Sequence, residues 1–158
     1  MVGAQDNGTE RLIGTTWDAI RGSDGMECII DEYDDNIIYS SSQYGGLKVT
    51  YNGGVDWNNA KPVSYDGAWV TPYKMHSNNN NLIVAGYDEV YKSVTSGAIW
   101  DSISYNITNG AEIKSISLAK SDENYIYAAS YSKIKVTKNG GVTWDYIKPG
   151  LPDYNITD

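Results

Sequence analysis

Tryptophan recurs along this chain at an almost constant interval. Trp17, Trp57, Trp100 and Trp144 are separated by about 40, 43 and 44 residues, a period typical of repeat architectures. One local pattern precedes each of the last three, at residues 50–57, 93–100 and 137–144. A second pattern, Asn followed by apolar residues, lies about twenty residues upstream, at 36–40, 81–85 and 124–128. Two patterns that recur together in one order three times establish a repeat.

Each repeat predicts four short antiparallel strands. We expect inner strands at residues 27–30, 70–73 and 113–118, the Asn-containing pattern as the second strand, and third strands at 46–50, 89–93 and 133–137. A glycine turn then leads to a fourth strand that carries the tryptophan, since glycine supplies the positive φ of a tight turn. Pro72 falls inside the second inner strand, which a sheet edge tolerates. Four strands in about 43 residues predict a β-propeller blade.

The composition agrees with an all-β fold. The chain of 158 residues has 14 tyrosines, 5 tryptophans, 16 glycines and no phenylalanine, and no stretch carries a helical apolar stripe. We expect about three four-stranded blades at residues 22–64, 65–107 and 108–149. Residues 1–21 would supply the outer two strands of a partial blade, and 150–158 the link and first strand of the next blade. The chain would thus be part of a longer propeller.

The charge and the cysteine content exclude several classes of function. The net charge of −8 disfavours nucleic acid and anionic membranes as partners. Cys28 is the single cysteine, so neither an internal disulfide nor a cysteine zinc motif is available. No apolar run is long enough to span a membrane. We expect no cofactor, no metal and no membrane insertion.

The segments before Trp57, Trp100 and Trp144 resemble Asp-box (BNR) repeats, whose pattern is Ser/Thr-x-Asp-x-Gly-x-x-Trp. The resemblance implies a structural turn in each blade. Asn52, Thr95 and Asn139 replace the aspartate, and Asn or Thr can cap such a turn without a charge. The implied structural residues are Thr50, Asn52, Gly54, Trp57, Ser93, Thr95, Gly97, Trp100, Thr137, Asn139, Gly141 and Trp144.

Two families of propeller are similar to this chain. Residues 3–9, 22–27 and 43–46 resemble sortilin-like and BNR-like propellers of secreted bacterial proteins, which implies a secreted or cell-surface protein. The repeat also resembles the propellers of glycoside hydrolase family 74, where a catalytic aspartate lies in a Thr-Asp-x-Gly-Gly segment. Gln43 stands at the matching position and cannot act as a base. A WD40 propeller is the rival on period alone, but His76, the single histidine, follows Met75 instead of a glycine.

The carboxylates offer few catalytic candidates. Asp24, just before an inner strand and near one mouth of the channel, is a weak catalytic candidate and a ligand-binding candidate. Asp6, Gln43 and Tyr44 are further ligand-binding candidates. The acidic cluster at 31–35 falls at a turn between strands and is interpreted as a solvated hairpin. It lacks the spacing of a calcium loop.

Other side chains are interpreted as structural. His76 lies in a polar segment and is expected to be a solvated loop residue, whereas Cys28 is expected to be buried and unreactive. Two arginines cannot supply the three that a sialidase uses. Exposed aromatic side chains could stack on sugar rings, or pack between blades; the candidates are Tyr44, Trp69, Tyr73, Tyr87 and Tyr131.

Three hypotheses for the function follow. The first is a non-catalytic propeller segment that acts as an interaction scaffold. The second is part of a propeller glycoside hydrolase acting on plant-type glucans, and the third is a sortilin-like peptide-binding propeller. Partners would be the remainder of a longer propeller or other copies of the chain, and a carbohydrate or peptide ligand. We expect the chain to self-associate through its end blades, and Trp57, Trp100 and Trp144 to be buried at equivalent positions.

Overall fold

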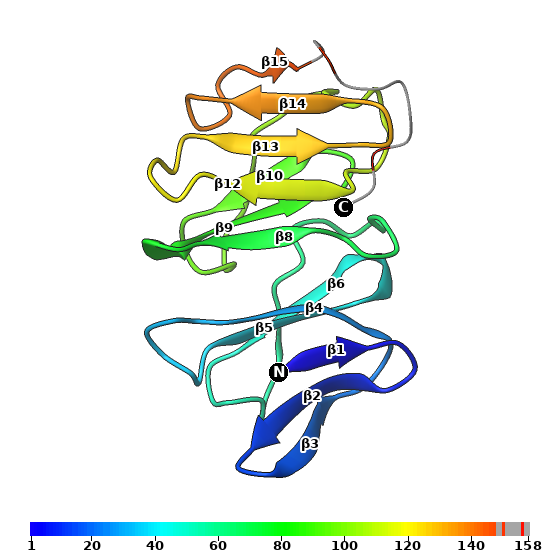
Figure 1. Cartoon of the computed structure of the whole chain (residues 1–158), viewed down its shortest axis with the longest axis vertical. Helices are drawn as coiled ribbons and strands as arrows, with labels where there is room; N and C mark the ends of the chain where they lie inside the picture. The colour runs from blue at the N-terminus through cyan, green and yellow to red at the C-terminus, as the bar shows by residue number, and fades with distance from the viewer. Residues whose placement is uncertain (148–149, 151–155, 157–158) are drawn as a thin grey trace.

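The computed structural model describes residues 1–147, 150 and 156, which fold as antiparallel β-sheet. Within this range the helical content is one three-residue 3₁₀ helix, η1 (Gln43–Gly45). Four sheets follow one another along the long axis of the molecule (Figure 1). The prediction of an all-β chain built from four-stranded units is confirmed.

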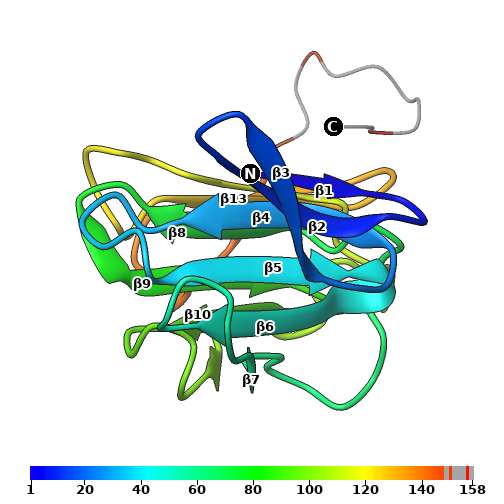
Figure 2. The same cartoon turned by 90° about the horizontal axis from the view of Figure 1, so that it is seen from below.

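Each sheet is a meander in which consecutive strands pair (Figure 2). The first sheet holds β1 (Val2–Ala4), β2 (Gly8–Ile13) and β3 (Thr16–Arg21). The second holds β4 (Gly25–Ile30), β5 (Ile38–Ser42), β6 (Gly46–Thr50) and β7 (Asn58–Asn59). The third holds β8 (Tyr73–His76), β9 (Asn79–Gly86), β10 (Val90–Ser93) and β11 (Asp101–Ser102). The fourth holds β12 (Ser115–Leu118), β13 (Ile126–Ala129), β14 (Ile134–Thr137) and β15 (Asp145–Tyr146).

Local side-chain hydrogen bonds form the turns between the first and second strands of two sheets. Asp34 Oδ1 accepts the backbone N–H of Asn36 over 3.0 Å, and Asp122 Oδ1 accepts that of Asn124 over 2.9 Å. Such bonds are the reason why Asp and Asn favour turns. The N–H of Asn36 also holds the pKa of the exposed Asp34 carboxyl below its usual value. Each turn therefore reverses the chain at the position that the repeat predicts.

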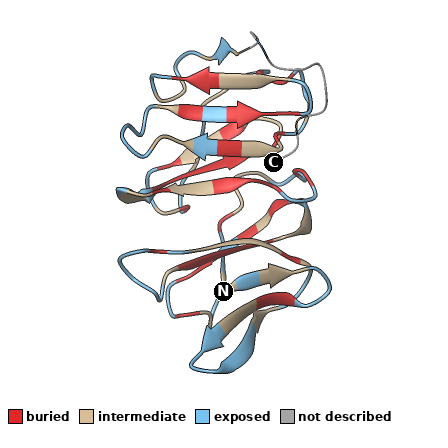
Figure 3. Cartoon of the chain, in the orientation of Figure 1, coloured by how far each residue is buried: buried red, intermediate tan, exposed pale blue. Residues whose placement is uncertain are grey.

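The apolar core lies between the sheets, on both sides of β9 (Figure 3). Ile83 and Ala85 pack with Tyr39 of the second sheet, whereas Leu82 and Val84 pack with Ile126 of the fourth. Successive side chains of a strand point to opposite faces, so a central strand that is buried on both faces reads as one apolar run.

Polar contacts and close backbone approach join the first sheet to the second. The hydroxyls of Thr9 and Ser40 are 2.6 Å apart, and both residues are buried. A Cβ atom added at Gly3 would lie 1.8 Å from the carbonyl oxygen of Met26. Only glycine fits where two backbones approach this closely.

The structure corrects three details of the expected layout. The first sheet has three strands where we expected two. The inner strand expected at 70–73 is β8, Tyr73–His76, so Pro72 lies before the strand and not inside it. The strand expected at 113–118 begins at Ser115. Most of the segment at 150–158, expected to begin the next blade, lies outside the described residues.

Candidate functional site

The predicted ligand-binding residues gather in the turns at one end of the strands of the first two sheets. The turn at 5–7 joins β1 to β2, the link at 22–24 joins β3 to β4, and η1 joins β5 to β6. Gly25, the first residue of β4, pairs with Ser42, the last residue of β5, so the adjoining Asp24 and Gln43 lie at the same end of the second sheet. Residues 67–69 pack on η1 through backbone hydrogen bonds. We call these four segments (5–7, 22–24, 43–45 and 67–69) the candidate rim.

Asp6 and Asp24 are in direct contact. The backbone N–H of Asp6 donates to Oδ1 of Asp24 over 2.8 Å. Asp6 has a φ of 65°, a conformation that non-glycine residues adopt mainly in turns. One oxygen of Asp24 is thus engaged in holding the neighbouring turn, which is a structural task for the weak catalytic candidate.

Asp6 and Tyr44 occupy matching places in successive sheets. Each follows a glutamine in a turn between two paired strands, β1 and β2 for Asp6 and β5 and β6 for Tyr44. Tyr44 has a φ of 59°. Gln43 precedes it, and its buried Oε1 has no donor within hydrogen-bonding distance among the described residues. The turn therefore holds an amide that cannot ionise beside an aromatic ring.

Tyr44 packs edge-on against Trp69, with ring centroids 5.0 Å apart and planes at 88°. Their exposed fractions are 45% and 40%, so this aromatic pair faces outward. Backbone bonds fix it, because the N–H of Tyr44 donates to the carbonyl of Trp69 over 3.1 Å. An exposed pair of this kind presents apolar faces with a polar tip.

Buried Tyr87 holds η1 of the candidate rim in place through a hydrogen bond. Its hydroxyl donates to the carbonyl of Gly45 over 2.6 Å, and burial raises the pKa of this phenol above its ordinary value. Tyr73 is also fully buried, with its hydroxyl on the carbonyl of Glu27. Of the two alternatives for these aromatic residues, stacking on sugars or packing between blades, Tyr73 and Tyr87 follow the second, because both fill the space between the second and third sheets. Tyr131 is half exposed.

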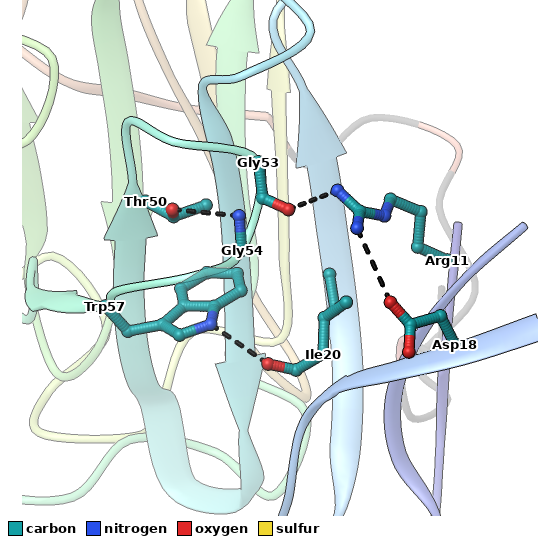
Figure 4. Close-up of polar contacts among 7 residues, drawn as sticks. All are labelled: Arg11, Asp18, Ile20, Thr50, Gly53, Gly54 and Trp57. Atoms are coloured by element: carbon teal, nitrogen blue, oxygen red, sulfur yellow. Dashed lines mark hydrogen bonds and ion pairs between the residues drawn. The ribbon is translucent and has the colours of Figure 1, made fainter. Parts of the chain in front are cut away.

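The turns before Trp57, Trp100 and Trp144 lie at the opposite end of the strands from the candidate rim. They share one pattern of hydrogen bonds from side chain to backbone. In the first, Thr50 Oγ1 accepts the N–H of Gly54 over 3.0 Å (Figure 4). In the same turn, Asn52 Oδ1 accepts the N–H of Asp56 over 2.9 Å. The corresponding bonds recur from Ser93 and Thr95, and from Thr137 and Asn139. We call these three segments the Trp turns.

The three tryptophans hold equivalent positions, each directly before the fourth strand of its sheet, but they are only partly buried. Trp57 donates from Nε1 to the carbonyl of Ile20 in the preceding sheet (Figure 4). Trp144 does the same to Ile103. Trp100 instead donates to Gly97 in its own turn. The expectation that they are buried is wrong, because each tryptophan keeps part of its surface exposed.

Two side chains are less solvated than their sequence context indicates. His76 is 5% exposed, with Nε2 3.2 Å from the carbonyl oxygen of Ala119 and Nδ1 accepting the N–H of Asn78. Asp31 is 4% exposed and accepts from Tyr33 N–H and Asn80 Nδ2. The interpretation of both as solvated residues is therefore wrong. Both are held by residues distant in sequence, Ala119 for His76 and Asn80 for Asp31.

Cys28 lies in β4 and is half-buried, not fully buried. Burial raises the pKa of its thiol above the ordinary value. Among the described residues, no group of three His, Cys, Asp or Glu side chains is placed to hold a metal ion. No helix in this part of the chain is long and apolar enough to cross a membrane.

Comparison with known proteins identifies the fold. No family model matches the chain, and no curated protein matches it in sequence. The GH74 xyloglucanase of Xanthomonas campestris matches 96% of this chain and 28% of its own, with a TM-score of 0.72 and 15% identity. The GH74 enzyme of Niastella koreensis matches 84% of this chain and 25% of its own, with a TM-score of 0.65 and 18% identity. A YCF48 protein bound to a D1 peptide matches 77% and 38%, with a TM-score of 0.56 and 14% identity.

The four sheets are therefore blades of a β-propeller type of fold. At these identities the likeness shows the fold alone. The chain spans between 25% and 38% of the length of these three structures, so it corresponds to a part of such a propeller.

Proposed function

We propose that this chain is a non-catalytic β-propeller segment that acts as a binding scaffold, and that the candidate rim contacts its ligand. The observation that carries the proposal is the exposed pair of Tyr44 and Trp69, which backbone bonds hold edge-on at the same end of the second sheet as Asp24. Aromatic faces next to fixed polar groups suit ligands that present both apolar faces and hydroxyl or amide groups. Gln43 supports binding over catalysis, since an amide cannot act as a base.

A carbohydrate is the ligand class that we favour, because stacking on exposed aromatic rings suits the apolar faces of sugars. The fold likeness to GH74 enzymes, one of them a xyloglucanase, supports this choice. A peptide ligand, as in a sortilin-like propeller, is supported by the likeness to a YCF48 protein bound to a D1 peptide.

The direct test is titration of the chain with xyloglucan oligosaccharides and, separately, with a library of short peptides. Tyr44→Ala is expected to weaken binding at the rim roughly tenfold or more, as for a central aromatic contact. Tyr33→Ala is the matched control, since Tyr33 is also exposed but lies in the β4–β5 turn at the other end of the sheet. Equal affinity of the two variants for every ligand would exclude the rim.

Part of a glycoside hydrolase is the second candidate, favoured by the same GH74 likeness. Asp24 would be its weak catalytic candidate, with Asp6 as the neighbouring carboxylate of the rim. Hydrolysis of xyloglucan by the full-length protein, lost in Asp24→Asn, would establish it. Binding without hydrolysis supports the scaffold.

Three further assignments belong to this proposal. We assign the Trp turns to the Asp-box (BNR) type, since Thr or Ser and the residue two positions later cap each turn. We place the protein outside the cell or at its surface, by resemblance to secreted propellers. We assign the blades to residues 22–64, 65–107 and 108–149.

We also propose that further propeller strands, from the same protein or another copy, cover the first sheet. Trp17 corresponds in the repeat to Trp57 and Trp144, yet it is 52% exposed, next to exposed Leu12 and Ile13. Sedimentation of this chain at micromolar concentration tests the version with copies. Self-association that Trp17→Lys abolishes would support it, whereas a strict monomer would contradict it.

A further inference from the structure

Arg21 carries a positive charge that has no carboxylate partner in the described part of the chain. It is half-buried at the end of β3. Its Nη2 donates to the carbonyl of Gly46 over 2.7 Å, and its Nη1 donates to the carbonyl of Ser40. Both acceptors are neutral. Among the described residues, no carboxylate lies within 4.0 Å of this guanidinium.

The repeat offers a direct comparison for this lack of a carboxylate partner. Arg21 follows Trp17 by four residues, and Lys61 follows Trp57 by the same number. Lys61 Nζ lies 3.3 Å from Asp66 Oδ1. The equivalent cation at the next sheet interface is therefore paired with a carboxylate, whereas Arg21 is held by carbonyl and hydroxyl oxygens.

A cavity of about 430 Å³ opens beside Arg21, between the first and second sheets. Lys48 also lines it and likewise has no carboxylate partner in the described part of the chain. The rest of the lining is neutral, with two hydroxyls, one amide and two glycines: Ser23, Ser42, Asn59, Gly22 and Gly46. Two unneutralised cations thus share one cavity in a chain whose net charge is −8.

We propose that this cavity binds an oxyanion, either a phosphate or sulfate group or the carboxylate of an acidic sugar. A partly desolvated cation is stabilised when an anion takes the place of lost water. Guanidinium and ammonium groups form their strongest hydrogen bonds with such oxygens. Arg21 and Lys48 supply the charge, and Ser42 supplies a hydroxyl on the same wall.

The proposal does not depend on the proposed function, because Tyr44 and Trp69 do not line this cavity. The cavity nevertheless shares Gly22 and Ser23 with the candidate rim, and Ser42 directly precedes Gln43. Tyr44 and Lys48 lie outside this shared segment, so loss of binding in Tyr44→Ala reports on the aromatic pair and loss of binding in Lys48→Gln reports on the cavity.

Titration with sodium phosphate, sodium sulfate and sodium D-glucuronate, at matched ionic strength, tests the proposal. Sodium chloride and neutral D-glucose are the reference solutes. The readout is the amide chemical shifts of Ser42, Gly46 and Lys48. We expect saturable shifts with at least one oxyanion. Preference for phosphate or sulfate would identify a tetrahedral anion, and preference for glucuronate would identify an acidic sugar.

Lys48→Gln is the informative variant, because Lys48 is exposed and its loss leaves the bonds of Arg21 intact. We expect it to weaken oxyanion affinity roughly three- to fivefold, in the range of a partly exposed ion pair. Lys135→Gln is the matched control. Lys135 of β14 lies opposite Tyr146 of β15, just as Lys48 of β6 lies opposite Asn59 of β7. Shifts that are unsaturable, that chloride reproduces, or that Lys48→Gln and Lys135→Gln leave equal would overturn the proposal.

Discussion

The indole Nε1 of Trp144 donates a hydrogen bond to the carbonyl oxygen of Ile103 over 2.8 Å, across the interface between the third and fourth sheets. Trp57 makes the same bond to Ile20 over 3.1 Å, between the first and second sheets. Each isoleucine follows the tryptophan of its own sheet by three residues. A Trp-x-x-Ile unit thus receives the tryptophan of the next sheet at these two interfaces, whereas Ala60 stands at the matching position of the second sheet and Trp100 donates to Gly97 in its own turn.

Removing this bond alone is expected to destabilise the fold measurably. Trp144→Phe keeps an aromatic ring but leaves the Ile103 carbonyl without its donor, so the free energy of unfolding should fall by about 1 kcal/mol. Trp17→Phe is the control, because no acceptor for its Nε1 lies among the described residues, and its effect should stay within about 0.5 kcal/mol. Urea unfolding followed by circular dichroism measures both. Equal effects would show that the bond contributes nothing specific.

Full truncation measures the packing of the indole in addition to its bond. Large aromatic residues in a core lose about 3–5 kcal/mol on truncation to Ala. Because Trp57 and Trp144 are only partly buried, Trp57→Ala and Trp144→Ala should fall at or below the lower end of that range. A loss of 5 kcal/mol or more in the same urea titration would indicate a fully buried indole.

The sequence predicted the sheets because their signals are local. The Asn-Gly-Gly turns and the run from Leu82 to Ala85 lie within a few residues of the strands they specify. The burial of His76 depends on the carbonyl of Ala119, 43 residues away. The contact of Tyr44 with Trp69 depends on a segment that returns to the rim after the fourth strand. Neither could be derived from spacing alone.

The Arg21 cavity was missed for a related reason. The sequence shows that Arg21 is one of two arginines, but its lack of a carboxylate partner emerges only when two sheets are packed together. Comparison with Lys61 through the repeat could have raised the question, since only the latter has an aspartate five residues downstream.

Asn52, in the first Trp turn, is expected not to tolerate replacement by Asp, because its side chain contacts the carboxylate of Asp56. Asn52 Nδ2 donates to Asp56 Oδ2 over 3.0 Å, whereas Asn139 Nδ2 donates to the hydroxyl of Thr143 over 2.9 Å. Asn52→Asp would set two carboxylates against each other and should reduce the free energy of unfolding by about 1 kcal/mol at neutral pH. Asn139→Asp meets a hydroxyl and should change it by less than about 0.5 kcal/mol.

The pH dependence separates this repulsion from a geometric effect. Protonation of either carboxylate removes the repulsion, so the deficit of Asn52→Asp should shrink as the pH falls below about 4. A deficit that is the same at about pH 3 as at pH 7, or equal deficits in the two variants, would contradict the explanation.

The support of the rim by Tyr87 gives a prediction that joins stability to binding. Tyr87→Phe removes the bond to the Gly45 carbonyl without changing the packing of the ring. A buried carbonyl left unpaired should lower the free energy of unfolding by about 1–3 kcal/mol. Ligand affinity at Tyr44 should fall as well, because η1 loses its anchor. Tyr125→Phe provides the comparison, since Tyr125 is only half-buried, and no change in either quantity is expected.

Cys28 allows a chemical test of its surroundings, because it is the single thiol. Burial raises its pKa, so less thiolate is present at pH 8 in the folded chain than in the urea-unfolded chain. Since the thiolate is the nucleophile, alkylation by iodoacetamide should be slower in the folded chain at pH 8. The rate should keep rising at pH values where that of the unfolded chain has levelled off. A folded rate profile with the same midpoint as the unfolded one, reduced by a constant factor, would indicate restricted access of the reagent and not a raised pKa.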